Sequence, residues 1–384
     1  MERLIRKFTE RFSHVPAAAA QAPGRLEVLG NHTDYNEGFV LSCAVSQVTR
    51  FVLAPVPGTR CTVLDCRSGA EMRFDLAALD KEPPKSGAKY IIGTLKELRA
   101  RGVAPFAFDA VLESEVPLSA GMSSSAALEV SCALAVIRCA GIDIDRAELA
   151  RAGQGVENNF LGLKTGLLDQ FSSLFGKKDS IIMSDFRSVS VVDSLPLPPG
   201  YCFVVINSMK KHHLVDSDYN SRREDCESAA ARLAAVYPGC RTLRDVSPEQ
   251  LAAAKEQLTE REYRRAAHVV QECDRVKKAA EMLKRGDIAG FGELLYASHD
   301  SSIRNFENSS EELDLLVELA RHDGACLGAR LSGGGFGGIT IHLVRSGDAA
   351  EYAGRIREEY RRRTGIAADT FISAIGDGAS GYRC

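Results

Sequence analysis

The hydrophobic residues of this chain follow two spacings, one typical of strands and one typical of helices. In the first half, alternating or continuous apolar runs predict strands around Leu26 and Val28 and over residues 39–45, 48–54, 61–65, 71–76, 106–115, 180–183 and 189–193. Apolar positions three and four residues apart predict helices over residues 1–10, 86–101, 126–140 and 145–161. Strands and helices therefore alternate, and residues 180–193 are expected to form a hairpin.

Longer and more strongly charged helices dominate the second half. The pattern predicts helices over residues 222–236, 249–257, 261–284, 288–304, 310–322 and 347–363, and strands over 201–207, 339–344 and 369–373. Closely spaced prolines at 195–200 break any element and mark a boundary, which predicts domains 1–198 and 199–384. A chain of 384 residues is also long for one core. The expected fold class is α+β with two lobes.

Composition narrows the function classes. The net charge of -3 argues against a broad basic face for nucleic acid. No apolar run reaches the roughly 20 residues that a membrane span needs. The eleven cysteines form no Cys-x-x-Cys pair, and the eight histidines show no zinc spacing, so reduced thiols in a cytoplasmic protein are expected. Nothing in the composition predicts an oligomer, and a monomer is favoured.

One Gly and three consecutive serines separate a predicted strand from a predicted helix. The stretch runs Pro-Leu-Ser-Ala-Gly-Met-Ser-Ser-Ser-Ala-Ala-Leu-Glu over residues 117–129. The first N–H groups of a helix have no partner within it and attract anions, and Gly121 allows a ligand to approach the backbone. The stretch is interpreted as a phosphate-binding loop. An ordinary Ser-capped helix is the alternative.

Two further polar stretches interrupt the apolar pattern. Residues 30–38 place Asn31, His32, Asp34, Tyr35 and Asn36 between two glycines. This composition is typical of a sugar site, and a plain hairpin loop is the alternative. Residues 164–170 form a short loop that ends with a carboxylate, in an otherwise apolar setting.

A glycine-rich run, Ser-Gly-Gly-Gly-Phe-Gly-Gly, occupies residues 332–338. Glycines 333, 335 and 338 satisfy Gly-x-Gly-x-x-Gly, but a β-rich segment follows instead of the helix that a dinucleotide turn requires. The P-loop motif and the protein-kinase motifs are absent. The run is interpreted either as a tight strand crossover or as backbone pressed against a phosphate or against the Ser-rich loop.

Together these stretches resemble motifs of the GHMP small-molecule kinases, and among them those of the galactokinase family. Residues 24–41 resemble the galactokinase signature, 117–129 the phosphate-binding motif, 331–338 the Gly-rich C-terminal motif, 164–170 the catalytic loop and 377–379 the family's ending. The resemblance implies a ribosomal-protein-S5-like N-terminal lobe and a ferredoxin-like C-terminal lobe. The active site would lie between them.

The resemblance also implies an activity, the ATP-dependent phosphorylation of the C1 hydroxyl of galactose, and a role for each matching residue. Arg25 and Asp169 would be catalytic, and Ser125 and Glu157 would hold Mg²⁺. The implied sugar contacts are Asn31, His32, Asp34, Gly166, Asp169 and Tyr219, and the implied nucleotide contacts are Gly121, Ser123, Ser124, Ser125 and Lys211.

Elementary chemistry agrees with these roles. Phosphoryl transfer needs positioning and charge neutralisation, which a carboxylate acceptor, an Arg and a hard cation with oxygen ligands supply. Each residue also has a plainer interpretation. Asp169 could cap a helix, Arg25 could lie on a strand surface, Glu157 could be solvated and Tyr219 could pack in the core.

One position departs from the family pattern. The signature usually has Glu where this chain has Asn31, and that Glu resembles a partner of the sugar's C6 hydroxyl. Because Asn would not repel a carboxylate, galacturonate is an alternative substrate, and Lys164 could add positive charge. Galactose is preferred because the rest of the motif is intact. A non-catalytic sensor of sugar and ATP is the alternative from another class, although the Ser-rich run, Asp169 and Arg25 are all present.

Overall fold

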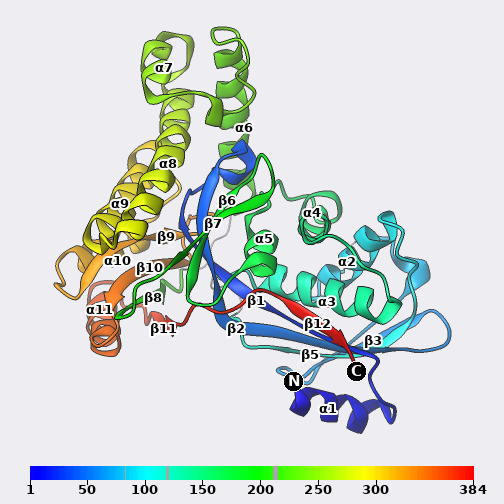
Figure 1. Ribbon diagram of the computed structural model, residues 1–384. Helices are drawn as coiled ribbons and strands as arrows, with labels where there is room; N and C mark the ends of the chain where they lie inside the picture. Colours follow the sequence, from blue (N-terminus) through cyan, green and yellow to red (C-terminus); the bar gives the residue numbers. More distant parts are fainter. Residues whose placement is uncertain (83, 118–120, 211–214) are drawn as a thin grey trace.

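Two β-sheets, each with its own helices, make up the molecule (Figure 1). The computed structural model describes residues 1–82, 84–117, 121–210 and 215–384. The first sheet has eight strands in the order β12-β1-β2-β5-β3-β4, with β6 paired to both β2 and β7. Its strands are β1 (Ala18–Leu29), β2 (Phe39–Pro55), β3 (Arg60–Asp65), β4 (Glu71–Asp75), β5 (Phe108–Ser114), β6 (Ser180–Asp185), β7 (Ser190–Pro196) and β12 (Ser380–Arg383).

Helices cover both faces of the first sheet (Figure 1). They are α1 (Glu2–Phe12), α2 (Ala88–Ala100), α3 (Ser124–Ala140), α4 (Arg146–Gly155) and α5 (Leu168–Phe175). Because side chains alternate along a strand, successive residues of β1 pack against helices on opposite faces of the sheet. Ala18 and Ala20 pack with α2 to α5, whereas Ala19 packs with Leu4 and Phe8 of α1.

The second sheet has four antiparallel strands in the order β11-β8-β10-β9. Its strands are β8 (Tyr201–Asn207), β9 (Cys326–Ser332), β10 (Ile339–Arg345) and β11 (Asp369–Ser373). Its helices are α8 (Glu260–Arg285), α9 (Ile288–Ser301), α10 (Glu311–Arg321) and α11 (Ala349–Thr364). One face packs on α10 and α11, and the other packs with α8 and α9.

One hydrophobic core joins the two sheets. It contains Leu26 and Val28 of β1, Phe203 and Val205 of β8, and Phe291 of α9, all of them buried. Because strand β1 contributes to the cores of both sheets, the two lobes share a continuous apolar interface. The space between the sheets is therefore held in a fixed geometry.

A helical projection extends beyond the second sheet (Figure 1). It consists of α6 (Val215–Ala234), α7 (Pro248–Ala253) and one end of α8, packed around Leu233, Leu243 and Val269. Capping boxes at Ser247 and Thr259 start α7 and α8. No helix among the described residues combines the length and the apolar character that crossing a bilayer requires.

The α+β prediction with two lobes is confirmed, and most of the predicted elements are present. Three elements were missed, namely β9, β12 and α5. The expected helix over 145–161 ends at Gly155 and continues as a π-helical turn, Val156–Phe160. The helix expected from residue 222 begins at Val215. Strand β12 pairs with β1 at the other end of the chain, so no local pattern reveals it, whereas β9 contains Gly328 and α5 has only eight residues, which weakens their periodicity.

The last strand returns to the first sheet. Strand β12 pairs with β1 from Ala18 to Gln21, so the chain crosses back over the boundary predicted after residue 198. Just before it, Ala379 is buried, and its carbonyl accepts a hydrogen bond from Arg146 Nη2 at 3.1 Å. The division into 1–198 and 199–384 stays a prediction, with this strand belonging structurally to the first sheet.

We therefore expect that deleting residues 377–384 lowers the thermal midpoint by about 5 °C or more, because the edge of β1 loses its partner and Ala379 leaves the core. The measurement is thermal unfolding followed by circular dichroism. Deleting Cys384 alone is the control, since that residue contributes only one backbone bond, to Ala17. An unchanged midpoint in the larger deletion would show that β12 is dispensable.

Candidate active site

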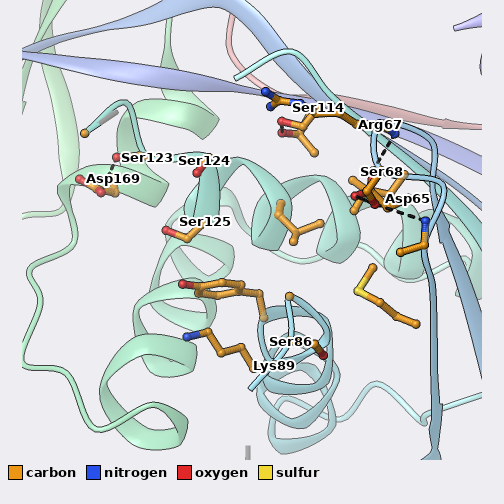
Figure 2. A pocket seen from close by; sticks show the side chains of 18 of the residues that line it. Asp65, Arg67, Ser68, Ser86, Lys89, Ser114, Ser123, Ser124, Ser125 and Asp169 are labelled. Carbon is orange, nitrogen blue, oxygen red and sulfur yellow. Dashed lines mark hydrogen bonds between the residues drawn. The ribbon is translucent and has the colours of Figure 1, made fainter. Parts of the chain in front are cut away.

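Two cavities meet between the sheets. The larger has a volume of about 780 Å³ and the smaller about 170 Å³. Both are lined by Arg25, Asp169, Gly333 and Gly334. The larger cavity continues along the start of α3 toward residues 65–90 (Figure 2). A group passing from one cavity to the other must therefore pass Asp169 and Arg25.

Asp169 is held by two partners. Its Oδ1 atom accepts a hydrogen bond from Arg25 Nε at 2.9 Å and forms an ion pair with Nη2 at 2.7 Å, and its Oδ2 atom accepts a hydrogen bond from Ser123 Oγ. Arg25 Nη1 also donates to the carbonyl of Gly121 at 2.6 Å. The Arg25 side chain is buried, whereas that of Asp169 is 28% exposed and lines both cavities. Three segments far apart in the sequence thus meet at one carboxylate.

The start of α3 has free backbone donors. Ser123 precedes the helix with a left-handed backbone and makes no side-chain cap, since its hydroxyl donates to Asp169. No described residue accepts a hydrogen bond from the first N–H groups of α3, which lie at the positive end of the helix dipole. Ser124 and Ser125 line the same cavity. An ordinary Ser-capped helix is not what forms here, and the geometry suits an anion such as phosphate.

Glu157 lies in the π-helical turn beside this helix start. Its Oε2 atom accepts a hydrogen bond from Thr165 Oγ1 at 2.6 Å, and its Oε1 atom lies 3.5 Å from Ser125 Oγ. Burial, with the nearby charge of Asp169, raises the pKa of Glu157 to about 7. The Ser125 hydroxyl and this carboxylate are hard oxygen ligands, and a cation between them would relieve the uncompensated charge.

The smaller cavity is lined by the residues of the predicted sugar site, His32, Asp34, Gly166 and Tyr219. Burial raises the pKa of Asp34 to about 6, and Leu168 N donates to its Oδ2 atom at 3.2 Å. A Cβ atom at Gly166 would lie 1.7 Å from that same oxygen, so only glycine fits beside Asp34. The glycine in the catalytic loop is therefore a steric requirement.

His32 is neutral and fully hydrogen-bonded. Burial lowers its pKa to about 3. Its Nε2 atom lies 3.2 Å from the carbonyl of Gly334 and must donate, so Nδ1 accepts from the Tyr35 hydroxyl at 2.8 Å. Its ring centroid lies 5.0 Å from that of Tyr219. His32 therefore shapes the cavity wall, and its direct contact with a sugar stays a prediction.

The glycine-rich run forms the floor between the two cavities. Gly333 lies beside Gly121 of the Ser-rich loop, and a Cβ at Gly335 would lie 2.1 Å from the Asn308 carbonyl. Four glycines in the run have positive φ, from 77° at Gly338 to 123° at Gly337. The interpretation that this backbone is pressed against the Ser-rich loop is confirmed. The run joins β9 to β10 without a helix, so it is no dinucleotide turn.

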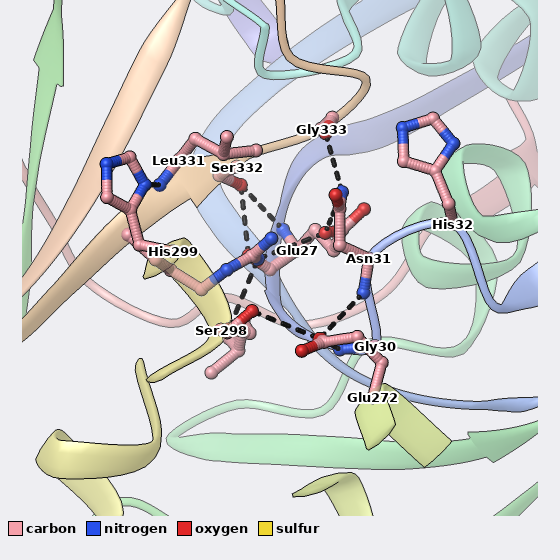
Figure 3. A network of polar contacts seen from close by, with 12 residues as sticks. Glu27, Gly30, Asn31, His32, Glu272, Ser298, His299, Leu331, Ser332 and Gly333 are labelled. Atoms are coloured by element: carbon pink, nitrogen blue, oxygen red, sulfur yellow. Dashed lines mark hydrogen bonds and ion pairs between the residues drawn. The ribbon is translucent and has the colours of Figure 1, made fainter. Parts of the chain in front are cut away.

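The amide of Asn31 is occupied within the protein (Figure 3). Its Nδ2 atom donates to Glu27 Oε1 and to the Gly333 carbonyl, both at 2.8 Å, and its Oδ1 atom accepts from Asn308 at 2.9 Å. Asn31 is also only 1% exposed. Its role as a direct sugar ligand stays a prediction, and the acidic group nearest to it is Glu27.

Several site residues were not found from the sequence. Glu27 lines the smaller cavity, Thr165 holds Glu157, and Gln170 donates to the buried carboxylate of Glu129 at 2.9 Å. Glu27 could have been suspected, because it alternates with the apolar Leu26 and Val28 and so shares a strand face with Arg25. The predicted phosphate-side residue Lys211 lies outside the described residues.

Comparisons with known proteins agree with this geometry. Residues 6–55 match the galactokinase galactose-binding signature, 89–177 the GHMP kinases N terminal domain and 279–362 the GHMP kinases C terminal domain. A galactokinase of Glaesserella parasuis serovar 5 (strain SH0165) is 39% identical over 380 residues, 97% of each chain. A galactokinase of Roseiflexus sp. (strain RS-1) is 36% identical, covering 98% of this chain and 95% of that protein.

Solved structures give the same picture. The crystal structure of Lactococcus lactis galactokinase complexed with galactose has a TM-score of 0.93 and 29% identity, with 99% of both chains covered. The fold and the matched domains define a GHMP small-molecule kinase, as the sequence motifs predicted. Within that class, the chain belongs to the galactokinase family.

The buried charge at Glu157 predicts a pH-dependent stability. Because the folded pKa is raised, the neutral carboxyl is favoured at low pH, and this advantage is lost as the pH rises through about 7. We expect Glu157→Gln, without nucleotide or metal, to raise the free energy of unfolding at pH 8 by about 1 to 3 kcal/mol, with little effect near pH 5. Urea unfolding at the two pH values measures this.

The control for this prediction is Glu148→Gln on the neighbouring helix α4. Its side chain is half exposed and pairs only with Arg151 on the surface. We expect no pH-dependent change from this substitution. An equal effect of Glu157→Gln at both pH values would contradict a raised pKa at Glu157.

Proposed function

We propose that the protein transfers the γ-phosphoryl group of ATP to the C1 hydroxyl of galactose. The observation that carries the proposal is the position of the Asp169–Arg25 pair where the two cavities meet. The larger cavity suits a nucleotide, and the smaller one suits a single sugar ring surrounded by polar groups. Family membership supports the same reaction.

The nucleotide would lie along the larger cavity (Figure 2). Its phosphates would meet the free N–H groups at the start of α3, with Gly121, Ser123, Ser124 and Ser125 around them. We assign the adenosine end to the wall formed by residues 65–72 and 85–90, where Met72, Leu112 and Leu128 offer apolar surface. Lys85 and Lys89 line the same cavity and could balance phosphate charge.

Asp169 would act on the C1 hydroxyl. Its carboxylate is fixed by Arg25 and Ser123 at the mouth of the sugar cavity, so it can accept the proton that leaves as the oxygen attacks phosphorus. Arg25 remains charged and lies where negative charge develops on the transferred group. Little covalent chemistry is required of the protein, because phosphoryl transfer depends mainly on positioning and charge neutralisation.

Mg²⁺ would be held by Ser125 and Glu157 together with the nucleotide phosphates. The raised pKa of Glu157 supports a cation there, because burial and the charge of Asp169 disfavour its carboxylate more than the contacts with described residues favour it. When bound, the ion would neutralise phosphate charge.

Two alternatives accompany this proposal. Galacturonate was suggested by the neutral Asn31, but that amide is occupied within the protein and an acidic side chain lies beside it. A non-catalytic sensor is disfavoured because the Asp169, Arg25 and Ser123 contacts are intact. Action in the cytoplasm with Mg²⁺, as a monomer, remains part of the proposal.

The direct test is ADP release in the presence of Mg²⁺. We expect galactose to support turnover well above the rates with galacturonate, N-acetylgalactosamine, arabinose and glucose, because the small cavity encloses one ring with fixed polar partners. A coupled spectrophotometric assay measures the rates, with ATP alone as the background. Tight sugar binding without ADP release would favour the sensor, and no response to any sugar would reject the sugar-kinase assignment.

The role of Asp169 can be tested separately. Asp169→Asn should reduce kcat by more than a hundredfold, because the proton acceptor is lost, while the dissociation constant for ATP changes little. Asp143→Asn, on a side chain that is 90% exposed, is the matched control and should behave as wild type. Turnover retained within about tenfold, a barrier change of roughly 1.4 kcal/mol, would exclude Asp169 as the base.

A further inference from the structure

Glu27 lies on the same strand face as Arg25 and borders the smaller cavity. Residues two apart on a strand share a face and lie about 6 to 7 Å apart. If the C1 hydroxyl lies at Asp169 and Arg25, Glu27 faces the far side of the same sugar ring. The hydroxymethyl group on C5 belongs to that remote part of a hexose.

The two carboxylate oxygens of Glu27 have different surroundings (Figure 3). Oε1 accepts hydrogen bonds from Asn31 Nδ2 at 2.8 Å and from Arg330 Nη1 at 3.0 Å. Oε2 receives no hydrogen bond from any residue in the described parts of the chain, although the Glu27 side chain is only 5% exposed. Oε2 is not among the fully buried unpartnered atoms of the described residues, so it is accessible from the cavity that Glu27 lines and can accept a hydrogen bond from the occupant.

Asn31 and Arg330 hold the Glu27 carboxylate in place through its Oε1 atom. Arg330 is fully buried and does not line the cavity, and it also donates to the carbonyls of Glu27 and Val28 at 3.2 and 3.4 Å. Asn31 has its amide engaged on three sides. Both residues therefore orient Glu27, and Oε2 is the atom left for a ligand.

The wall of the smaller cavity is acidic. Three carboxylates line it, those of Glu27, Asp34 and Asp169. The one positively charged side chain among the described lining residues is Arg25, and it is paired with Asp169. A ligand with its own carboxylate remote from C1 would thus meet Glu27 before it could reach Arg330.

We propose that Glu27 is the residue that reads the C6 substituent of the sugar, accepting a hydrogen bond from a C6 hydroxyl and rejecting a C6 carboxylate, with Asn31 as its positioning residue. The proposal rests on the function proposed above, since the placement of C6 follows from placing C1 at Asp169. It transfers C6 recognition from position 31 to position 27.

A substrate series on the unmodified protein tests the charge at C6. The sugars are galactose, 6-deoxygalactose, galacturonate and 6-amino-6-deoxygalactose, which present a hydroxyl, a methyl, an anion and a cation. We expect kcat/KM to fall by about tenfold for the methyl and by more than a hundredfold for the anion, whereas the cation stays within about tenfold of galactose. Calorimetric binding of each sugar without ATP should follow the same order.

Substitutions then test which residue determines the preference between a cationic and an anionic C6 group. Glu27→Gln keeps an acceptor for Asn31 but leaves Arg330 unbalanced, so galacturonate should gain at least tenfold relative to 6-amino-6-deoxygalactose. Asn31→Ala should weaken galactose use while preserving the order of cation over anion, because the carboxylate remains. Glu256→Gln, an exposed residue in the helical projection, removes the same charge and should change nothing.

The outcomes separate the two proposals. If the unmodified protein phosphorylates none of the four sugars, the proposed function fails. If it phosphorylates galactose but treats anion and cation alike, or prefers galacturonate, the role of Glu27 is overturned while the kinase activity stands. If Asn31→Ala, with Glu27 intact, no longer prefers 6-amino-6-deoxygalactose over galacturonate, position 31 and not position 27 determines C6 recognition. Should Glu27→Gln fail to fold, the substrate series on the unmodified protein still decides.

Discussion

The ion pair between Arg25 and Asp169 is the interaction on which the site depends. It joins β1 to the first turn of α5, and through Ser123 it also reaches the start of α3. The same hydroxyl that could have capped α3 is used for this contact, so the helix keeps free N–H groups for an anion. One carboxylate thereby orders both the acceptor for the sugar proton and the binding site for phosphate. The Arg25 side chain is buried, whereas that of Asp169 keeps 28% exposure and so remains accessible to a ligand.

Strand β1 serves packing and chemistry at once. Leu26 and Val28 point into the core shared by the two sheets, and Arg25 and Glu27 point into the cavities. The apolar residues of the strand fix the register of the polar ones, since a shift by one residue would turn Arg25 and Glu27 from the cavities into the hydrophobic core. The same core binds the second sheet, which carries the glycine-rich run to the opposite wall. Specificity at Glu27 is thus tied to the packing of the whole molecule.

The site contains several buried carboxyl groups whose charged form is disfavoured by burial. Burial raises the pKa of Asp34 to about 6 and that of Glu157 to about 7, and the pKa of Glu129 lies well above its ordinary value for the same reason. Such groups reduce stability near neutral pH and are retained where ligands balance them. A sugar that donates hydrogen bonds and a cation with nucleotide phosphates would supply that balance. The empty protein is expected to be less stable than its complex.

The sequence by itself determined the α+β class, most long helices and strands, and the motifs at 24–41, 117–129, 164–170 and 331–338, because each is written in local periodicity or in residues that tolerate few conformations. It did not determine β12, whose partner β1 lies at the other end of the chain, nor the Gly-containing strand β9 and the short helix α5. Nor could it show that the side-chain amide of Asn31 is already hydrogen-bonded to Glu27, Gly333 and Asn308. Only the tertiary structure decided which carboxylate faces the cavity. Hydrogen bonds between residues about 300 positions apart follow from how two sheets pack, and no local pattern encodes them.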